Sequence, residues 1–440
     1  MSQVQKPKKG YKSVPWLFGK EIEIPQEWEC VDVEYVSDKL LSGGTPSTII
    51  PEYWEGNIPW TKGAVLTTNI TIKGERLISE LGLKNSSTSI IPKDNLLVVS
   101  RVSIGNVSIN KIDIAINQDI TAVILNKTIC LTEFLYWNLL QTLSILVSFS
   151  QGTTIQGFTR KDLSSHKVLL PPLPEQQQIA SILSNVDSLI ESTSKIIENS
   201  KSLKTGLMQK LLTRGIGHTK FKKVRLKFHF LNYDIPEHWE IIPIKKLSTL
   251  VKGAVMTGPF GLMLHSSDYV VTGTPLILIK NIQFGKIIDN DIPKISKEDT
   301  ERLSRYKVKE GDLVFSRVGR VGSSALIERK HHGWLISGQL LRIRFDNPNL
   351  NYYYLNYFIQ SHFFYRELIP ELLGSTRDSI NTEILENLPI IVPPKKEQDK
   401  ITNILSNIDA QIDSQTQYKE KLERLKKSLM QKLLTGEVRV

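Results

Sequence analysis

The chain has 440 residues, enough for two or three domains that each bury a core of their own. Its 56 lysines and arginines outnumber 45 acidic residues, and the net charge of +11 favours a polyanionic partner such as nucleic acid. Two cysteines, Cys30 and Cys130, exclude a disulfide framework and a cysteine zinc site, so we expect a reducing cytoplasm. We expect no signal peptide, and no membrane span.

Two stretches with the same beginning start the two halves of the chain. The stretch 24–38 opens with Ile24, Pro25 and Trp28, and the stretch 235–249 repeats this spacing with Ile235, Pro236 and Trp239. Short β-rich runs broken by turn residues follow in each half. Residues 91–109 and 308–327 each predict a strand, a tight glycine-containing loop and a second strand, with Arg101 and Arg317 just before the loops.

A further strand, a helix and a polar loop complete each half. Residues 117–126 and 337–346 alternate like strands, and the apolar segments 132–150 and 351–373 predict one helix each. The polar loops that follow are 151–160 and 373–382, and a basic connection, 214–234, joins the halves. Each half is therefore predicted to be a β-rich domain that ends in a polar loop.

The most informative stretch is written twice with an offset of 222 residues. PPLPEQQQIASILSNVD (171–187) returns as PPKKEQDKITNILSNID (393–409), and LMQKLLT (207–213) returns as 429–435. Prolines just before each helix, Glu175 and Glu397 in the first turns, and Gly215 and Gly436 after the last apolar residues predict helices about 55–60 Å long. Apolar residues spaced by three and four predict a coiled-coil seam. It consists of Ile182, Val186, Leu189, Ile196, Leu203 and Leu207, and of Ile404, Ile408, Tyr418, Leu422, Leu425 and Leu429.

The order of domain, long helix, domain, long helix constrains the geometry. If the second domain is compact, both helices attached to it run antiparallel, and the chain becomes a dumbbell with pseudo-twofold symmetry. The predicted fold class is α+β, with two β-rich domains joined and spaced by two long antiparallel coiled-coil helices. We place the first domain at 1–168, the first helical region at 169–217, the second domain at 218–390 and the second helical region at 391–440.

Sequence motifs for catalysis are missing. There is no phosphate loop for ATP hydrolysis and no tetrapeptide that would hold a flipped adenine in a DNA amino-methyltransferase. No cluster of carboxylates or histidines predicts a metal site or a nuclease centre, so we expect a chain that is not an enzyme and binds no metal.

The two repeats entered through P-P-x-x-E-Q-x-x-I, the LMQKLLT tails, and the loops GTT (152–154) and GST (374–376) resemble the specificity subunit of type I restriction–modification enzymes. Lys395 and Lys396 depart from the Leu173 and Pro174 of the first copy. The resemblance covers nearly the whole chain. It implies two target-recognition domains on an asymmetric bipartite site in double-stranded DNA. It also implies two methyltransferase subunits and motor–nuclease subunits as partners. S-adenosylmethionine, ATP and Mg²⁺ would be bound by those partners and not by this chain.

Candidate contact residues lie in the loops between matching elements. Arginine favours guanine edges and Asn or Gln adenine edges, while Lys, Ser and Thr often hold phosphates. The DNA-binding candidates are Lys62, Arg101, Thr153, Thr154, Gln156 and Arg160 in the first half, and Lys280, Arg317, Arg320, Ser375, Arg377 and Asn381 in the second. We expect six leucines to be shared between the seam and the surface that contacts a partner subunit, namely Leu203, Leu207, Leu211, Leu425, Leu429 and Leu433.

Two alternative interpretations remain open at the level of sequence. One is a fused enzyme with its own methylase, which the missing methylase motifs disfavour. The other is a coiled-coil adaptor whose end domains bind proteins rather than DNA. The basic, β-rich end domains favour DNA, but composition does not decide between these two partners.

Overall fold

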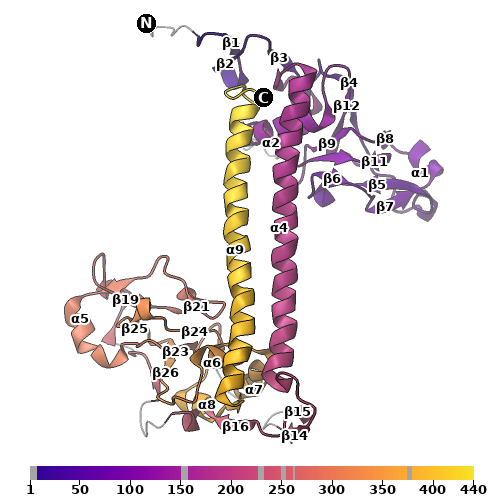
Figure 1. The fold of residues 1–440 in the computed structure, drawn as a ribbon. Helices are drawn as coiled ribbons and strands as arrows, with labels where there is room; N and C mark the ends of the chain where they lie inside the picture. The colour runs from indigo at the N-terminus through magenta and orange to yellow at the C-terminus, as the bar shows by residue number, and fades with distance from the viewer. Residues whose placement is uncertain (1–6, 150–156, 226–231, 249–253, 261–262, 374–378) are drawn as a thin grey trace. The chain divides into compact units, whose positions relative to one another are not determined.

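The computed structural model describes residues 7–149, 157–225, 232–248, 254–260, 263–373 and 379–440. The chain forms two compact units. Unit 1 comprises residues 1–194 and 417–440, and unit 2 comprises residues 195–416. Each long helix contributes to both units, and the end of the chain completes unit 1 (Figure 1). No described helix is both long enough and apolar enough to cross a membrane.

Unit 1 contains two short-stranded sheets and a covering helix. Five strands pair in the order β4-β12-β9-β10-β6, and four in the order β7-β5-β11-β8. Helix α2 (Thr132–Phe149) packs Phe134, Tyr136 and Trp137 into the core beside the first sheet. The strands are β4 (Ser37–Ser42), β5 (Ile58–Thr61), β6 (Ile70–Thr71), β7 (Arg76–Ile78), β8 (Ser89–Ile91), β9 (Leu96–Val99), β10 (Val107–Asn110), β11 (Ile114–Ile116) and β12 (Ile120–Leu125), with the short helix α1 (Glu80–Lys84).

Unit 2 repeats this plan with its own strands. Sheets are ordered β17-β26-β23-β24 and β18-β22-β19-β25, and a hairpin, β20-β21, stands beside them. The predicted hairpins are confirmed, since β9 pairs antiparallel with β10 and β23 with β24. The elements are β17 (Val255–Thr257), β18 (Tyr269–Val270), β19 (Thr274–Ile277), β20 (Ile282–Gln283), β21 (Lys286–Ile287), β22 (Lys294–Ile295), α5 (Lys297–Arg302), β23 (Leu313–Ser316), β24 (Ser324–Leu326), β25 (Leu335–Ile336) and β26 (Leu340–Ile343).

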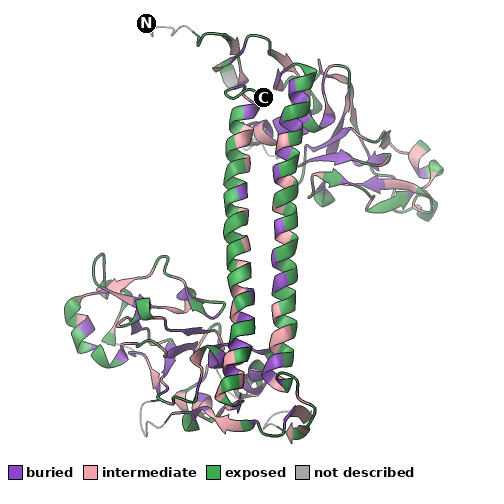
Figure 2. Ribbon diagram, in the orientation of Figure 1, coloured by how far each residue is buried: buried purple, intermediate pink, exposed green. Residues whose placement is uncertain are grey.

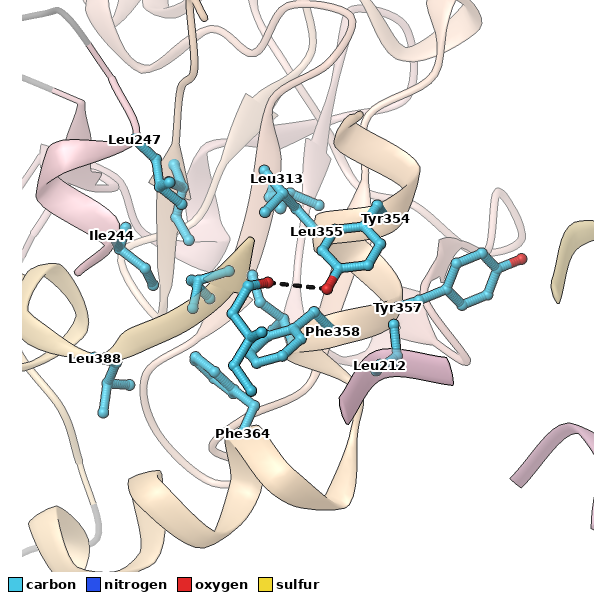
Figure 3. Close-up of a cluster of buried hydrophobic side chains, with 14 of the residues drawn as sticks. Leu212, Ile244, Leu247, Leu313, Tyr354, Leu355, Tyr357, Phe358, Phe364 and Leu388 are labelled. Atoms are coloured by element: carbon cyan, nitrogen blue, oxygen red, sulfur yellow. Dashed lines mark hydrogen bonds between the residues drawn. The ribbon is translucent and has the colours of Figure 1, made fainter. Parts of the chain in front are cut away.

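The helix predicted over 351–373 is two helices, α6 (Tyr352–Ile359) and α7 (His362–Leu373). Ser361 lies between them, and its hydroxyl accepts a hydrogen bond from the Phe364 amide, as a residue at a helix start does. The prediction of a single helix was wrong because the apolar periodicity continues through this break. In the core of unit 2, the Tyr354 hydroxyl donates to the Ile391 carbonyl at 2.9 Å, surrounded by buried side chains that include Leu212 and Phe358 (Figure 3).

Paired strands bring the start of each half to the start of its long helix. In unit 1, β1 (Tyr11–Pro15) pairs with β2 (Glu21–Pro25), and β3 (Glu29–Asp32) pairs with β13 (Lys167–Leu170) just before the helix. Unit 2 repeats the arrangement, with a short helix before the last strand in each unit. These elements are β14 (Phe221–Arg225), β15 (Asn232–Pro236), β16 (Glu240–Pro243) and β27 (Pro389–Val392), and the short helices are α3 (Arg160–Ser164) and α8 (Thr382–Asn387).

The long helices are α4 (Leu173–Arg214) and α9 (Lys395–Leu433). Their 42 and 39 residues correspond to about 63 and 59 Å at 1.5 Å per residue, close to the prediction. Gly215 and Gly436 follow with φ of +63° and +73°, a conformation that favours glycine after a helix. Within unit 1 the start of α4 packs beside the end of α9, and within unit 2 the end of α4 packs beside the start of α9. The helices are therefore antiparallel in each unit.

The seam between the helices differs in phase from the prediction. Its positions step by four and three, and every position in α4 has a counterpart 222 residues later in α9. Buried and half-buried residues alternate with exposed ones along both helices (Figure 2). Leu189, Ile196 and Leu203 were predicted in the seam but are 46%, 42% and 56% exposed, as are Ile404, Tyr418 and Leu425 to similar degrees. The observed positions are Ile179, Leu183, Val186, Ile190, Thr193, Ile197, Ser200, Lys204, Leu207 and Leu211, and Ile401, Leu405, Ile408, Ile412, Gln415, Lys419, Leu422, Lys426, Leu429 and Leu433.

Candidate nucleic-acid interface and partner surfaces

In unit 1 the loop after β9 carries Arg101 at the surface. The backbone of this loop is unusual, since Val102 and Ser103 have φ of +50° and +60°. Two predicted regions meet here. The Phe158 amide donates to the Ser100 carbonyl at 3.2 Å, and a Cβ on Gly63 would lie 3.5 Å from the Arg101 carbonyl. The exposed Arg101 side chain is therefore flanked by the Lys62 loop and by the end of the polar loop.

Unit 2 has a similar junction, in which the acceptor carbonyl is that of the arginine itself and not of the serine before it. The Ile380 amide donates to the Arg317 carbonyl at 3.0 Å, and Ile380 corresponds to Phe158 in the repeat with an offset of 222. The Arg317 guanidinium donates to the Ile380 carbonyl at 3.2 Å and lies 4.9 Å from the ring centre of the exposed Phe260. Partial burial lowers the pKa of Arg317 from its usual range. Arg317 is thus held more rigidly than Arg101.

The two candidate lysines are already neutralised by carboxylates of their own units. Lys62 lies 2.7 Å from Glu75, and Lys280 pairs with Asp291. Exposed pairs of this kind contribute little to stability, so either lysine can exchange its partner for a phosphate at small cost. These ion pairs could not be predicted from the sequence, because neither acidic residue is adjacent to its lysine in the chain.

The remaining candidates fall into three groups. Arg160 and Arg320 are exposed, the first at the start of α3 and the second in the loop after β23. Asn381 caps α8, where its side-chain oxygen accepts from the Ile384 amide at 2.8 Å, a structural role that the sequence analysis did not assign. Outside the described residues lie Thr153, Thr154, Gln156, Ser375 and Arg377.

The repeated Glu–Gln pair at the start of each long helix anchors it to its unit. Trp28 Nε1 donates to Glu175 at 2.9 Å, and Trp239 Nε1 donates to Glu397 at 3.0 Å, with both indoles fully buried. The adjacent Gln176 side chain accepts from the Leu131 amide and donates to two backbone carbonyls. Gln398 makes the equivalent bonds in unit 2. The motif residues therefore tie each helix to the first and last strands of its unit and to the helix between them.

A pair of ion pairs fixes the register of the seam. Lys426 lies 2.5 Å from Asp187 in unit 1, and Lys204 lies 2.6 Å from Asp409 in unit 2. The two pairs are related by the 222-residue repeat, lysine for lysine and aspartate for aspartate. Tyr357, on α6, donates a hydrogen bond to Asp409 at 2.6 Å, so this aspartate is held by α6 as well as by Lys204 of α4.

The leucines predicted to contact a partner divide by exposure. Leu211 and Leu433 are 6% and 1% exposed and belong to the cores of their own units, which leaves them little surface for a partner. Leu207 and Leu429 are half-buried against those cores. Leu203 and Leu425 are exposed and remain the two predicted positions with most surface available for a partner.

Each unit also has a groove beside the end of a long helix. The groove of unit 2 has a volume of about 1160 Å³ and is bordered by α4, α6 and α7, and that of unit 1, about 650 Å³, by α2, α4 and α9. Three lining positions correspond between them through the 222-residue repeat. These are Thr205, Met208 and Gln209 in unit 2, and Lys427, Met430 and Gln431 in unit 1.

The sequence matches the family model for the type I restriction modification DNA specificity domain twice, over residues 25–200 and 236–424. Together these two matches cover most of the chain. The chain belongs to the type I restriction–modification specificity family. It is thus a DNA-recognition subunit, and the resemblance in the sequence is confirmed.

Two curated relatives match nearly the whole length of this specificity subunit. The type I restriction enzyme MjaVIII specificity subunit of Methanocaldococcus jannaschii is 28% identical over 425 residues, 95% of each chain. The MjaIX specificity subunit of the same organism is 26% identical over 430 residues, again 95% of each chain. The S subunit from M. genitalium has a similar fold, with a TM-score of 0.58 at 15% identity over 92% of this chain and 96% of that one.

Sequence reasoning missed two features of the specificity subunit. Phe260 lies beside Arg317 although 57 positions separate them in the chain, because the segment 258–260 packs closely on residues 337–338. The methionines Met208 and Met430 were read only as part of a helical repeat, yet they line equivalent grooves. The repeat itself was the signal that could have paired the methionines, whereas no local pattern marks Phe260.

Proposed function

We propose that each unit reads one half of a bipartite site in double-stranded DNA through its arginine loop. The observation that carries the proposal is the equivalence of the Arg101 and Arg317 junctions. Each arginine follows the same strand of the repeat. The position after the polar loop donates a hydrogen bond beside it, from Phe158 to the Ser100 carbonyl in unit 1 and from Ile380 to the Arg317 carbonyl in unit 2. Around these similar backbone contacts the side chains differ between the halves, since Arg317 stacks on Phe260 whereas Arg101 is exposed. The two half-sites should therefore differ, which makes the site asymmetric.

We further propose that two methyltransferase subunits bind at equivalent surfaces of the two units. Two copies of one partner need two similar surfaces, and the grooves at Met208 and Met430 occupy corresponding positions. Methionine side chains suit such contacts because they adapt to different shapes. Exposed Leu203 and Leu425, which also correspond in the repeat, would extend each surface along its helix. Motor–nuclease subunits would complete the assembly.

The chain would carry out no chemical step. Methylation and cleavage would depend on S-adenosylmethionine, ATP and Mg²⁺ bound by the partner subunits, in the cytoplasm where the DNA is. The specificity subunit would then contribute sequence reading and spacing only. This division of labour is supported by the sequence, which lacks phosphate-loop and methylase motifs.

A salt-dependent gel shift tests the DNA function. The purified chain with a methyltransferase partner should bind DNA with an affinity that falls steeply as salt rises. Arg317→Ala should weaken recognition of one half-site position by about 1–3 kcal/mol if it reads a base, or weaken all sequences evenly if it holds a phosphate. Arg424→Ala, an exposed arginine on α9, is the matched control. Unchanged binding in both Arg101→Ala and Arg317→Ala would contradict the proposal.

The adaptor alternative makes a different prediction in the same experiment. End domains that bind proteins would give no shift of DNA at low salt, with or without a methyltransferase. The fused enzyme would methylate DNA without any partner subunit.

A further inference from the structure

Two histidines and a glutamate converge in unit 2 where α4 ends. His218 lies four residues beyond the last residue of α4, His238 precedes the buried Trp239, and Glu397 lies in the first turn of α9. His218 Nε2 lies 2.6 Å from Glu397 Oε1, and His238 Nε2 lies 3.8 Å from Glu397 Oε2. One nitrogen or oxygen of each side chain falls within 4.8 Å of the others, an arrangement found once among the described residues.

The equivalent place in unit 1 is built differently. There Glu175 receives two hydrogen bonds from Arg439, at 2.6 and 2.9 Å, besides that of Trp28. A guanidinium fills the space in front of the carboxylate with a fixed charge. In unit 2 imidazoles stand there instead of a guanidinium, and His238 is too far from Glu397 for a hydrogen bond. The helix anchor common to both units therefore does not require the second histidine.

The ligand set matches a transition metal. Imidazole nitrogen and carboxylate oxygen are ordinary zinc ligands, with bonds of about 2.0–2.1 Å. Ligand atoms around a tetrahedral ion are then about 3.3 Å apart. One ligand atom of each residue lies within 4.8 Å of the others here, so closure needs side-chain shifts of up to about 1.5 Å.

The surroundings hold the carboxylate in place for such an ion. Trp239 Nε1 donates to Glu397 Oε2 at 3.0 Å and the Ile216 amide donates to Oε1 at 3.0 Å, which are the supporting contacts that orient a metal ligand. Gly215 allows the close approach, because a Cβ there would lie 2.5 Å from Glu397 Oε1.

We propose that His218, His238 and Glu397 bind one divalent transition-metal ion, with Zn²⁺ as the best match. His238, whose side chain is 51% exposed, leaves the fourth position open to water. The bound ion would join the end of α4, the start of the second recognition half and the first turn of α9. Its role is structural, as a clamp within unit 2 that has no counterpart at Glu175.

Calorimetric titration of the full-length chain without a histidine tag tests this site. After removal of metals with EDTA, the chain should bind one equivalent of Zn²⁺, and its melting temperature should rise with zinc. His238→Ala should abolish both effects without unfolding the chain, because this side chain is largely exposed. His218→Ala should also abolish zinc binding and the rise in melting temperature. His332 is exposed and lies outside the cluster, so His332→Ala is the matched control that should retain both effects.

Two results would overturn the proposal. One is the lack of any zinc binding by the wild-type chain, which would reduce the cluster to a hydrogen bond between His218 and Glu397. The other is full binding in His238→Ala, which would place the ion elsewhere. Neither result bears on DNA recognition, because the site does not include the arginine loops.

Discussion

Cutting the chain after Gly217 tests the seam and the repeat together. Unit 1 would then lose residues 417–440, which supply the buried Leu433 and Leu434 and the Lys426 partner of Asp187. Truncating one buried leucine to alanine costs about 2–5 kcal/mol. Two leucines therefore remove about 4–10 kcal/mol from a unit whose total stability is on the order of 5–15 kcal/mol. A folded monomer of residues 1–217 is not expected.

A second copy of the fragment can replace the lost segment. Leu211 and Leu212 repeat Leu433 and Leu434 with an offset of 222 residues, and Lys204 repeats Lys426. The end of α4 from one copy can therefore fill the core of the other copy, and the same exchange in reverse gives a symmetric dimer. Asp187 of each copy would pair with Lys204 of the other. We predict that residues 1–217 form a homodimer that, with a methyltransferase, recognises an interrupted palindrome.

Light scattering on the purified fragment and on a charge-reversed variant measures whether residues 1–217 form the predicted dimer. The Asp187–Lys426 pair is 21% and 22% exposed, and hydrogen bonds to charged groups of this kind contribute about 1.5–3 kcal/mol. Lys204→Glu should thus weaken the dimer about 10- to 100-fold or more for each pair lost. Lys204→Glu combined with Asp187→Lys should restore it. A folded monomer at micromolar concentration, or a dimer indifferent to Lys204→Glu, would refute the reasoning.

Three further predictions concern single features. The double variant Leu203→Asp, Leu425→Asp should stop co-purification of a methyltransferase. It should change the free energy of unfolding by less than about 1 kcal/mol, because both side chains are exposed. Retained co-purification would contradict the proposed partner surface. Burial lowers the pKa of His166 to about 4, below its unfolded value of about 6.5. The contribution of neutral His166 to the free energy of unfolding is therefore complete above about pH 6.5 and is lost as the pH falls toward 4. The loss is at most about 3 kcal/mol and should show in urea midpoints at pH 7 and 5, whereas His166→Gln should flatten this dependence. Asn381→Ala should lower the free energy of unfolding by about 1 kcal/mol and Asn381→Ser by less, because serine also caps helices; equal losses would show that the cap is unimportant.

The repeat made most of the architecture predictable. Strand–loop–strand units at Arg101 and Arg317 and the bounds of both long helices followed from turn residues, prolines and periodicity. The phase of the seam did not, because polar residues such as Thr193, Ser200 and Lys204 occupy inward positions while apolar Ile196 and Leu203 face outward. Spacing alone does not distinguish an apolar stripe that packs within the chain from one that could contact a partner.

Contacts between distant segments were the other limit. His218 and Glu397 are 179 positions apart, and nothing local to either residue indicates that they meet. The same holds for Arg317 with Phe260, and for Lys62 with Glu75. Side-chain partners of candidate site residues therefore required the fold, whereas the candidate loops themselves were evident from their place between repeated elements.

Mapping methylated adenines in cells that express this chain with its methyltransferase partner tests the central claim most directly. Two different reading units should give one asymmetric site, with two specified halves separated by unspecified bases. The halves should lie about one turn of the duplex apart, near 34 Å, if both units contact one face. Replacing Arg317 with alanine should relax one half of that site and leave the other unchanged. A continuous or palindromic site, or relaxation of both halves together, would contradict two independent reading units.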